Sequence, residues 1–550
     1  MTLLTPSQLE LETTVSEPQL SAKVDFDHFP PGVRGLRKAA TSFLAILALA
    51  LVGVQFALTM ARPDFDDPDI WWHIRNAQYL VEQHHFVRRD MYSFTAPAHP
   101  WVNSEWLAEI PYYLAYRGLG LSGLKAMTFV LPSILMLLLL YLCYEESRSF
   151  KASVAVCSLV SLLAVASYGP RTILFGYILL VLLLIILQRF RAGGCAPLWT
   201  VPPLFCVWAN THGSWALGLI LFFLVAVAGL VGGTWGRIES TCWSRTQLGK
   251  LAVTGAASVA ALFLNPYGWR LVNYPFDLAF RQKLNVSHVI EWASVNFQDT
   301  RGNLVFVVIA GLFAAALVRR SRWNLGELLM FVFALHTALA HVRFLVLLGI
   351  VVAPMLAKLL DFFPPYRPEL DTPRVNVAVM LAAIAGMTYF WPRESAIQSS
   401  LAKGYPTAAL SYLKANPPQG NVLNFYLWGG FLEWNAREVK TFIDSRVDIF
   451  EYAGVLEDYL DLLGSDSLLR RIDPIIEKYH IRYVLFPPGD SKNKLLGANG
   501  VAYLLEHDPQ WKVVYRDSIC VLMERREPGR ADQTGETQPR GIPATTRTSE

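Results

Sequence analysis

The strongest constraint on the fold is a succession of apolar segments that runs through the first 391 residues. We predict membrane-spanning helices at about 41–60, 122–143, 152–168, 173–189, 198–211, 214–233, 248–264, 303–318, 325–339, 344–360 and 375–391. Several are shorter than the roughly 20 residues that cross a bilayer as a helix. Hydrophobic residues make up 53% of the chain and charged residues 17%, which excludes an ordinary soluble enzyme. The sequence therefore predicts a polytopic all-α membrane domain of about 11 transmembrane helices over residues 38–391.

Three other regions lack this continuous apolar character. Residues 1–37 and 527–550 are polar, and we expect a disordered N-terminus and a disordered tail. Residues 392–526 read as a small soluble α/β domain. We expect strands at 420–426, 440–443 and 481–486, a hairpin within 511–524, and helices at 454–479 and 499–507. The six cysteines form no CxxC pair, so neither a disulfide framework nor a zinc site is predicted.

The distribution of Lys and Arg predicts how the chain is oriented in the membrane. Loops rich in basic residues alternate with loops that have few, and in bacterial membranes the basic loops face the cytoplasm. The N-terminus is then cytoplasmic, and the chain is a multi-pass protein of the plasma (inner) membrane. The outer side receives the large first loop 61–121, the turns at 171, 210–212 and 341–343, the loop 265–302 and the soluble domain 392–526. The net charge of +4 gives no reason to expect nucleic acid as a partner.

A short polar segment directly after the first span carries the densest chemistry. It reads Asp66-Asp67-Pro68-Asp69-Ile70-Trp71-Trp72-His73. Asp67 and Asp69 have the spacing of a carboxylate pair, in which one member acts as a general base or both bind Mg²⁺ or Mn²⁺. The alternative is an acidic turn that starts an interfacial helix, with Trp71 and Trp72 in the aromatic belt. Trp71, Trp72 and His73 are predicted to bind substrate, with the two tryptophans offering flat surfaces on which a sugar can stack or a lipid can anchor.

A second segment of the same loop offers a further carboxylate. Glu105 and Glu109 lie four residues apart, next to an apolar stripe that contains Trp106 and Tyr113. This spacing is typical of an amphipathic helix in the membrane interface. Glu105 either contributes to a catalytic site or faces water on a simple anchor helix.

The remaining candidates lie in the short outer turns. Arg171 and Arg343 are predicted to bind phosphate, because a guanidinium donates paired hydrogen bonds to phosphate oxygens. Both residues fall on the predicted outer side, so the enrichment of basic residues in cytoplasmic loops does not explain them. Ionisable residues at the ends of apolar spans are functional candidates in general. The predicted substrate-binding set is therefore completed by His212, Tyr267, Arg270 and His341.

These residues together support a family resemblance. Asp-x-Asp-x-Trp-Trp-His at 67–73, followed by Trp-x-x-x-Glu-Trp-Leu at 101–107, resembles the GT-C superfamily of membrane glycosyltransferases. The branch it is similar to is bacterial and related to the dolichyl-phosphate-mannose–protein mannosyltransferases and the lipid A aminoarabinose transferases. The resemblance covers the spans through residue 391. It implies that a first-loop aspartate, Asp67 or Asp69, is the base or a metal ligand, and that the donor is a polyprenyl-phosphate-linked sugar.

The predicted activity is a glycosyl transfer of EC class 2.4. The sugar moves, with inversion, from a polyprenyl-phosphate donor in the membrane lipid to an extracytoplasmic glycan, lipid or protein acceptor. The alternatives are a transporter or flippase of lipid-linked saccharides, which carries no chemistry, and a scaffold whose soluble domain binds a partner. Polar groups that collect on one face, without an inverted repeat, favour the enzyme over the transporter.

Two motifs in the soluble domain bear on the acceptor. Many-span oligosaccharyltransferases carry an aromatic-Gly motif after the last span, and Trp428-Gly429-Gly430 is similar in placement. The favoured interpretation is structural: Trp428 in the core, Gly429-Gly430 in a turn, and Asp444 with Arg446 as a surface pair.

Overall fold

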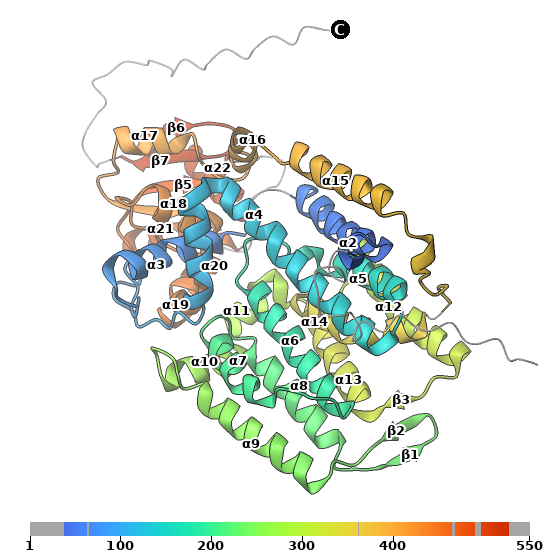
Figure 1. Ribbon diagram of the computed structural model, residues 1–550. Coiled ribbons are helices and arrows are strands. Elements are labelled where there is room, and N and C mark those ends of the chain that lie inside the picture. The colour runs from blue at the N-terminus through green and yellow to red at the C-terminus, as the bar shows by residue number, and fades with distance from the viewer. Residues whose placement is uncertain are drawn as a thin grey trace, which may run out of the picture.

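The computed structural model describes residues 38–62, 65, 67–360, 362–464, 468–489 and 497–526. The predicted disorder of 1–37 and 527–550 lies outside these ranges, as does Asp66. Figure 1 shows a long bundle of helices with the C-terminal region attached at one end.

A helix covers each of the eleven predicted apolar segments. These helices are α2 (Phe43–Met60), α4 (Trp106–Ser147), α5 (Phe150–Ala164), α6 (Ile173–Arg191), α7 (Val201–Ala209), α8 (Trp215–Ala228), α9 (Arg245–Ala261), α12 (Thr300–Arg319), α13 (Leu325–Ala340), α14 (Leu345–Leu359) and α15 (Pro373–Tyr389). Within the described ranges, five helical segments are long and apolar enough to cross a membrane. The number becomes six if α15 and α16 (Glu394–Leu401), which meet at 52°, form one span. The chain is thus a multi-pass membrane protein, and the count of eleven crossings stays a prediction.

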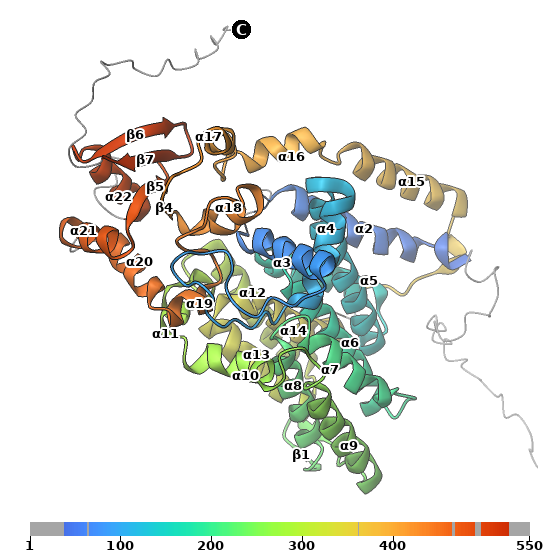
Figure 2. The same cartoon turned by 90° about the vertical axis from the view of Figure 1, so that its left-hand side faces the viewer.

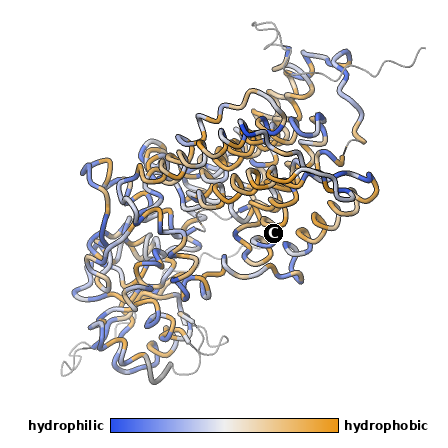
Figure 3. The backbone as a smooth tube through the Cα atoms, turned by 90° about the horizontal axis from the view of Figure 1, so that it is seen from below, coloured by the Kyte–Doolittle hydropathy of each residue, from blue (hydrophilic) through white to orange (hydrophobic). Residues whose placement is uncertain are grey.

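The centre of the bundle is α14, which packs against α4, α5 and α13. Within α14 only Pro354 and Lys358 are not buried. A side chain at Gly349 would place its Cβ 2.8 Å from Val160, so this glycine allows α14 and α5 to approach closely. Figure 3 shows the corresponding concentration of hydrophobic backbone in the bundle.

The helix α4 consists of two helical pieces that meet at Gly120. Gly120 has φ 63°, a conformation that glycine adopts without strain. Glu394 accepts hydrogen bonds from the backbone N–H groups of Leu121 and Ser122 and so caps the second piece. The first piece is the amphipathic helix that the sequence predicts from Trp106 onward.

The loops between these helices contain short elements of their own. The first loop forms α3 (Asp69–Gln83), and the loop 265–302 forms α10 (Trp269–Phe280), α11 (Lys283–His288) and η4 (Ile290–Trp292). The turn before α14 is η5 (Val342–Phe344). Away from these loops, β1 (Gly233–Trp235) and β2 (Ile238–Ser240) form a hairpin that pairs with β3 (Trp323–Asn324).

The C-terminal region contains the α/β part that the sequence predicts. Its sheet has the order β4-β5-β7-β6, with β4 (Asn421–Asn424) parallel to β5 (Ile481–Phe486), and with β7 (Val521–Arg525) antiparallel to β5 and to β6 (Trp511–Arg516). Helices surround it: α17 (Ala409–Ala415), α18 (Gly429–Asn435), α19 (Val447–Tyr452), α20 (Val455–Leu463), α21 (Leu468–Lys478) and α22 (Gly497–Glu506). The predicted helix 454–479 is therefore two helices.

The strand predicted at 440–443 is wrong. This segment makes one isolated bridge, between Thr441 and Ser93 of the first loop. The Thr441 N–H donates to the carbonyl of Tyr92, and the Phe442 N–H donates to the side-chain oxygen of Asn424. The backbone bonds of the segment thus go to the first loop and to a side chain rather than to a neighbouring strand.

The C-terminal region is packed closely onto the first loop. A Cβ at Gly430, near the start of α18, would lie 3.0 Å from the carbonyl oxygen of Pro68, immediately before α3. Figure 2 shows α18 lying beside α3. Gly429 and Gly430 therefore begin a helix at a close contact, and the predicted turn at these two residues is wrong. Trp428 is 3% exposed, which confirms its prediction as a core residue.

Candidate functional site

The site begins at the N-terminus of α3, where the polar segment of the first loop is placed. Asp67 is buried, and its Oδ1 accepts a hydrogen bond from the backbone N–H of Asp69 at 3.0 Å. Asp69 is half-buried and opens the helix, where a carboxylate interacts favourably with the positive end of the helix dipole. The two carboxylates therefore lie at one helix start with different degrees of exposure.

Arg171 connects this helix start to the loop 265–302. Its Nε lies 2.5 Å from Oδ2 of Asp67, and its other nitrogen Nη1 pairs with Glu291. The two carboxylates come from residues 224 positions apart in the sequence, so the turn before α6 joins two distant loops. A carboxylate on each side of the Arg171 guanidinium leaves its charge largely neutralised.

A second chain of contacts runs from His73 through Glu105 to His212. His73 Nδ1 lies 3.0 Å from Glu109, and its Nε2 lies 3.4 Å from Glu105. The other oxygen of Glu105 lies 3.4 Å from His212 Nε2. Thr172, next to Arg171, donates a hydrogen bond to Glu105 at 2.7 Å. This bond links the contacts of His73, Glu105 and His212 to the ion pairs of Arg171. Glu105 therefore lies inside the site and not on a water-facing anchor.

The pKa values of Asp67, Asp69 and His73 are all shifted upward by their surroundings. Burial raises the pKa of Asp69 to about 7, and the charge of Asp67 adds to this effect. Burial also raises the pKa of Asp67, and Arg171 opposes that rise. For His73, burial lowers the pKa, but the hydrogen bond to Glu109 and the charge of Glu105 outweigh it and raise the pKa to about 9. His73 is thus a cation at neutral pH, and Asp69 titrates there.

The pKa values of His212 and Glu291 are lowered, in contrast to those of Asp69 and His73. Burial lowers the pKa of His212 to about 4, so its ring is neutral at pH 7. Its Nδ1 accepts from the backbone N–H of Ser214, which leaves Nε2 to carry the proton that points to Glu105. Burial would raise the pKa of Glu291, but the charges of Arg171 and Arg343 lower it, so this carboxylate is ionised.

Arg343 provides a cation beside these groups. Its guanidinium lies over the ring of Trp292 at 4.3 Å from the ring centre. His341 supports the same tryptophan, with its Nδ1 2.7 Å from the Trp292 carbonyl oxygen. Across the described ranges, no carboxylate lies within ion-pair distance of the Arg343 guanidinium. Its charge nevertheless acts on Glu291 and His212, which places it at the edge of the cluster.

We call this set the first-loop cluster. It comprises Asp67, Asp69, His73, Glu105, Glu109, Arg171, His212, Glu291 and Arg343. The structure thus brings the first-loop carboxylates together with guanidiniums from two later turns. In the sequence, Glu291 lies three residues after His288, at the spacing of neighbours on a helix, but His288 is exposed and bonds within its own helix. Spacing along one helix could not reveal a partner 120 residues away.

Four other predicted binding residues lie elsewhere or are enclosed. Trp71 and Trp72 are 1% and 7% exposed, so the predicted aromatic belt or stacking surface is wrong for both. Trp72 instead donates its indole N–H towards Asp69 and the hydroxyl of Ser445. Tyr267 is buried and donates to the carbonyl of Val87, which is a structural role. Arg270 is exposed and lines a separate pocket.

The C-terminal region contributes to the site in a way that the sequence did not indicate. The predicted surface pair of Asp444 and Arg446 is wrong, because both side chains are fully buried. Arg446 pairs with Asp444 and with Asp90 of the first loop, and Glu433 lies 3.6 Å away. This buried cluster fixes the first loop against the C-terminal region, and it places Ser445 beside Trp72 and Asp69.

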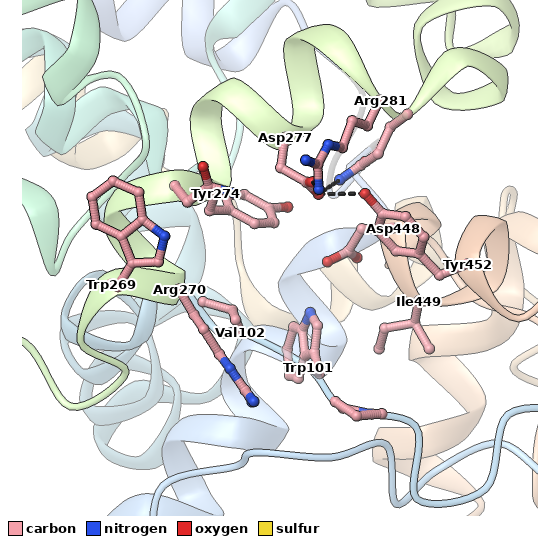
Figure 4. Close-up of a pocket in the computed structure, with 13 residues that line it drawn as sticks. Trp101, Val102, Trp269, Arg270, Tyr274, Asp277, Arg281, Asp448, Ile449 and Tyr452 are labelled. Atoms are coloured by element: carbon pink, nitrogen blue, oxygen red, sulfur yellow. Dashed lines mark hydrogen bonds and ion pairs between the residues drawn. The ribbon is translucent and has the colours of Figure 1, made fainter.

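A pocket of about 310 Å³ lies next to the first-loop cluster, between α10 and α19 (Figure 4). Tyr274 and Asp448 face each other across it, and Trp101 forms another wall. Trp101 packs edge-on against Trp72 at 5.6 Å between ring centres, so the pocket adjoins the helix start that carries Asp69.

The predicted metal site at Asp67 and Asp69 stays a prediction. Within the described part of the chain, no three His, Cys, Asp or Glu side chains are arranged to hold one ion. Asp67 is engaged by a guanidinium in the position that a cation would take. The residues present therefore fit an arginine-neutralised carboxylate better than a ligand of Mg²⁺ or Mn²⁺.

Comparisons with known proteins concern the fold. No family model and no curated protein matches the sequence. The crystal structure of ArnT from Cupriavidus metallidurans bound to undecaprenyl phosphate aligns with a TM-score of 0.50 at 13% identity, covering 87% of this chain and 97% of that one. The apo oligosaccharyltransferase of Archaeoglobus fulgidus aligns with a TM-score of 0.49 at 12% identity, over 81% and 69% of the two chains. The likeness to ArnT shows that this chain shares the fold of that protein, in agreement with the predicted many-span helical domain followed by a C-terminal α/β region.

Proposed function

We propose that this protein is a membrane glycosyltransferase that moves a sugar from a polyprenyl-phosphate donor to an extracytoplasmic acceptor. The observation that carries the proposal is the convergence of two first-loop carboxylates, the Arg171–Glu291 bridge and Arg343 at one end of a GT-C-like bundle. The solved ArnT structure contains undecaprenyl phosphate, and this supports a lipid of the same class as the donor carrier here. In this proposal the first loop and the C-terminal region face away from the cytoplasm.

Asp69 is the proposed base. It is half-buried, and a base is most effective when its pKa lies near the working pH, as the value of about 7 for Asp69 does. Asp67 is enclosed and paired with Arg171, so it is less suited to accept a proton from a substrate. The structure therefore favours one of the two carboxylates that the sequence left open, and Asp67 becomes the residue that positions Arg171.

The proposed reaction is a single displacement. Asp69 accepts the proton of the acceptor hydroxyl or amide while the acceptor atom forms a bond to the anomeric carbon. The bond from the anomeric carbon to the donor phosphate oxygen breaks, and the oxygen leaves with the electron pair. Arg343 neutralises the departing phosphate, because its guanidinium is held over Trp292 and lacks a carboxylate partner among the described residues. One displacement inverts the configuration of the sugar.

The experiment that tests this function distinguishes chemistry from transport. The purified protein is reconstituted into liposomes with a lipid extract of its producing cells that carries ¹⁴C-labelled polyprenyl-phosphate sugars. We expect label to leave the polyprenyl-phosphate fraction and to appear in a second product only when protein is present. Movement of the intact labelled lipid between leaflets, without a second product, would contradict the proposal and indicate a flippase.

A further inference from the structure

The helix α10 has two distinct faces that meet along the pocket. Arg270, Asn273, Tyr274 and Asp277 lie within about one quarter of the helix circumference and line the pocket. The adjacent stripe consists of Trp269, Phe276 and Phe280, at helical spacing i, i+7 and i+11, and Trp269 also borders the pocket. These three side chains are 65%, 49% and 77% exposed. One side of α10 is thus a polar pocket wall, and the side next to it is an exposed aromatic stripe.

The aromatic stripe continues the apolar surface of the bundle. Leu264, shortly after the end of α9, is 68% exposed, and Phe263 stacks on Trp269 with 6.0 Å between the ring centres. Val253, within α9, is 71% exposed. Figure 1 shows α10 following the end of α9, on the side of the bundle where α19 lies. Exposed aromatic residues on an amphipathic helix next to the end of an apolar helix are typical of a helix that lies in the bilayer interface.

The polar side of α10 is held against α19, so the pocket is preformed. Tyr452 of α19 donates a hydrogen bond to Asp277 (Figure 4). Glu451 accepts hydrogen bonds from the backbone N–H groups of Leu284 and Asn285 at 3.0 and 2.9 Å, which caps α11 directly after α10. A rigid pocket loses little conformational entropy when it binds a ligand.

The composition of the pocket fits a group that carries several hydroxyls. Asp277 and Asp448 offer carboxylate oxygens as acceptors, and Asn273, Tyr274 and Tyr452 offer both donors and acceptors. Trp101 is 6% exposed, so it closes one side of the pocket without offering a broad stacking face. Two arginines, Arg270 and Arg281, and two carboxylates, Asp277 and Asp448, line the pocket, so their formal charges balance and leave no surplus positive charge for a phosphate.

We propose that this pocket is the acceptor site, and that the acceptor is a membrane lipid with a hydroxyl-bearing head group. The head group lies between Tyr274 and Asp448, while the lipid chains stay in the bilayer beside Trp269, Phe276 and Phe280. Tyr274 connects the pocket to the first-loop cluster, because the charges of Glu105 and Arg343 act on its hydroxyl, and the reacting hydroxyl enters the cluster from this side. This inference rests on the proposed transferase function and assigns its acceptor class.

Site-directed photocross-linking tests the assignment, because it captures whichever molecule occupies the pocket. The full-length protein carries p-benzoylphenylalanine in place of Tyr452, which lies on the α19 side of the pocket and faces Asp277. The matched control carries it in place of Val513, which is 39% exposed on β6 in the C-terminal sheet. After irradiation of native membranes, the protein is digested and its adducts are identified by mass spectrometry.

We expect a lipid adduct with a hydroxylated head group at position 452, and little at position 513. Asp448→Asn lowers the yield about tenfold, because it removes a carboxylate that accepts hydrogen bonds from the head group. A polyprenyl-phosphate adduct at 452, a peptide adduct there, or equal lipid yields at both positions would overturn the assignment. Asp69→Asn stops transfer but leaves the adduct in place, so a failure of the transferase function is seen separately from a failure of the acceptor site.

Discussion

Two clusters of charged side chains lie at opposite ends of the same helix bundle. Arg171 of the first-loop cluster precedes α6, and Arg191 ends it, so the two ends are about 28 Å apart along this helix. The second cluster, which we call the distal cluster, contains Glu146, Arg191, Glu327 and Lys358. Lys358 lies 2.5 Å from Glu146 and 2.8 Å from Glu327, and Arg191 lies 2.9 Å from Glu327.

The clusters differ in charge balance. The distal cluster has two cations and two carboxylates, and every member has an opposite partner. The first-loop cluster has five carboxylates, which face two arginines and one protonated histidine. Arg343 stacks on an aromatic ring and has no carboxylate partner among the residues that the structure describes. Balanced pairs hold helices together, whereas a surplus of carboxylates with shifted pKa values beside an unpaired cation is typical of a functional site. The comparison therefore supports a structural role for the distal cluster and the proposed catalytic role for the first-loop cluster.

The largest expected difference in kcat is between two variants that each replace a carboxylate by the corresponding amide, one in the first-loop cluster and one in the distal cluster. Asp69→Asn is expected to lower kcat about 10²- to 10⁴-fold, because it removes the proposed base. Glu327→Gln is expected to leave kcat within about twofold, since its role is pairing. Both variants are compared by transfer rate after their folding has been checked by thermal melting. Equal losses of kcat would remove the distinction between the clusters.

The Asp67–Arg171 pair gives the next largest effect. Asp67→Asn and Arg171→Gln are each expected to lower kcat about 10- to 100-fold, because each displaces the groups that surround Asp69. The double variant is expected to lose little more than either single variant, since both remove one interaction. Kinetics of all three variants form the double-mutant cycle. Fully additive losses would show that the pair does not act as a unit.

At the distal end we expect a loss of stability rather than of rate. Glu327→Gln leaves Lys358 and Arg191 with one carboxylate fewer, which is expected to lower the free energy of unfolding by about 1–3 kcal/mol. The melting temperature in detergent measures this, with Glu369→Gln, outside both clusters, as the control. An unchanged melting temperature would show that the distal cluster does not stabilise the bundle.

The smallest effect concerns pH. Asp69 must be ionised to act as a base, so activity is expected to fall as the pH drops below about 7. The Ser445 side chain lowers the pKa of Asp69, and Ser445→Ala should therefore move the acidic limb to higher pH. The loss at pH 7 is expected to be about twofold, as for one weak hydrogen bond. The profile of kcat/KM against pH measures the shift, and a limb that moves to lower pH would contradict the assignment of Asp69.

Much of the architecture could be predicted from the sequence, because apolar segments of span length leave few alternatives. The positions of Asp67, Glu105, His212 and Arg343 on one face followed from the distribution of basic residues. What could not be predicted was pairing between distant loops, such as Arg171 with Glu291. The burial of Trp71, Trp72 and Arg446 depends on the C-terminal region folding over the first loop, which no local pattern records.

The choice between Asp67 and Asp69 shows the same limit. Both carry the same side chain within one short motif, so composition and spacing treat them alike. Their environments differ because Arg171 reaches Asp67, whereas the side chains that hydrogen-bond to Asp69, Trp72 and Ser445, carry no charge. Only the folded chain distinguishes a paired carboxylate from a titrating one.

The measurement that tests the central claim most directly is the affinity of the protein for undecaprenyl phosphate. It does not depend on the identity of the sugar or the acceptor. Arg343→Gln is expected to weaken binding at least about tenfold, because it removes a charged donor to the phosphate, whereas Arg191→Gln in the distal cluster leaves binding unchanged. Equal affinities for the two variants, or a larger loss with Arg191→Gln, would contradict the assignment of the active site to the first-loop cluster.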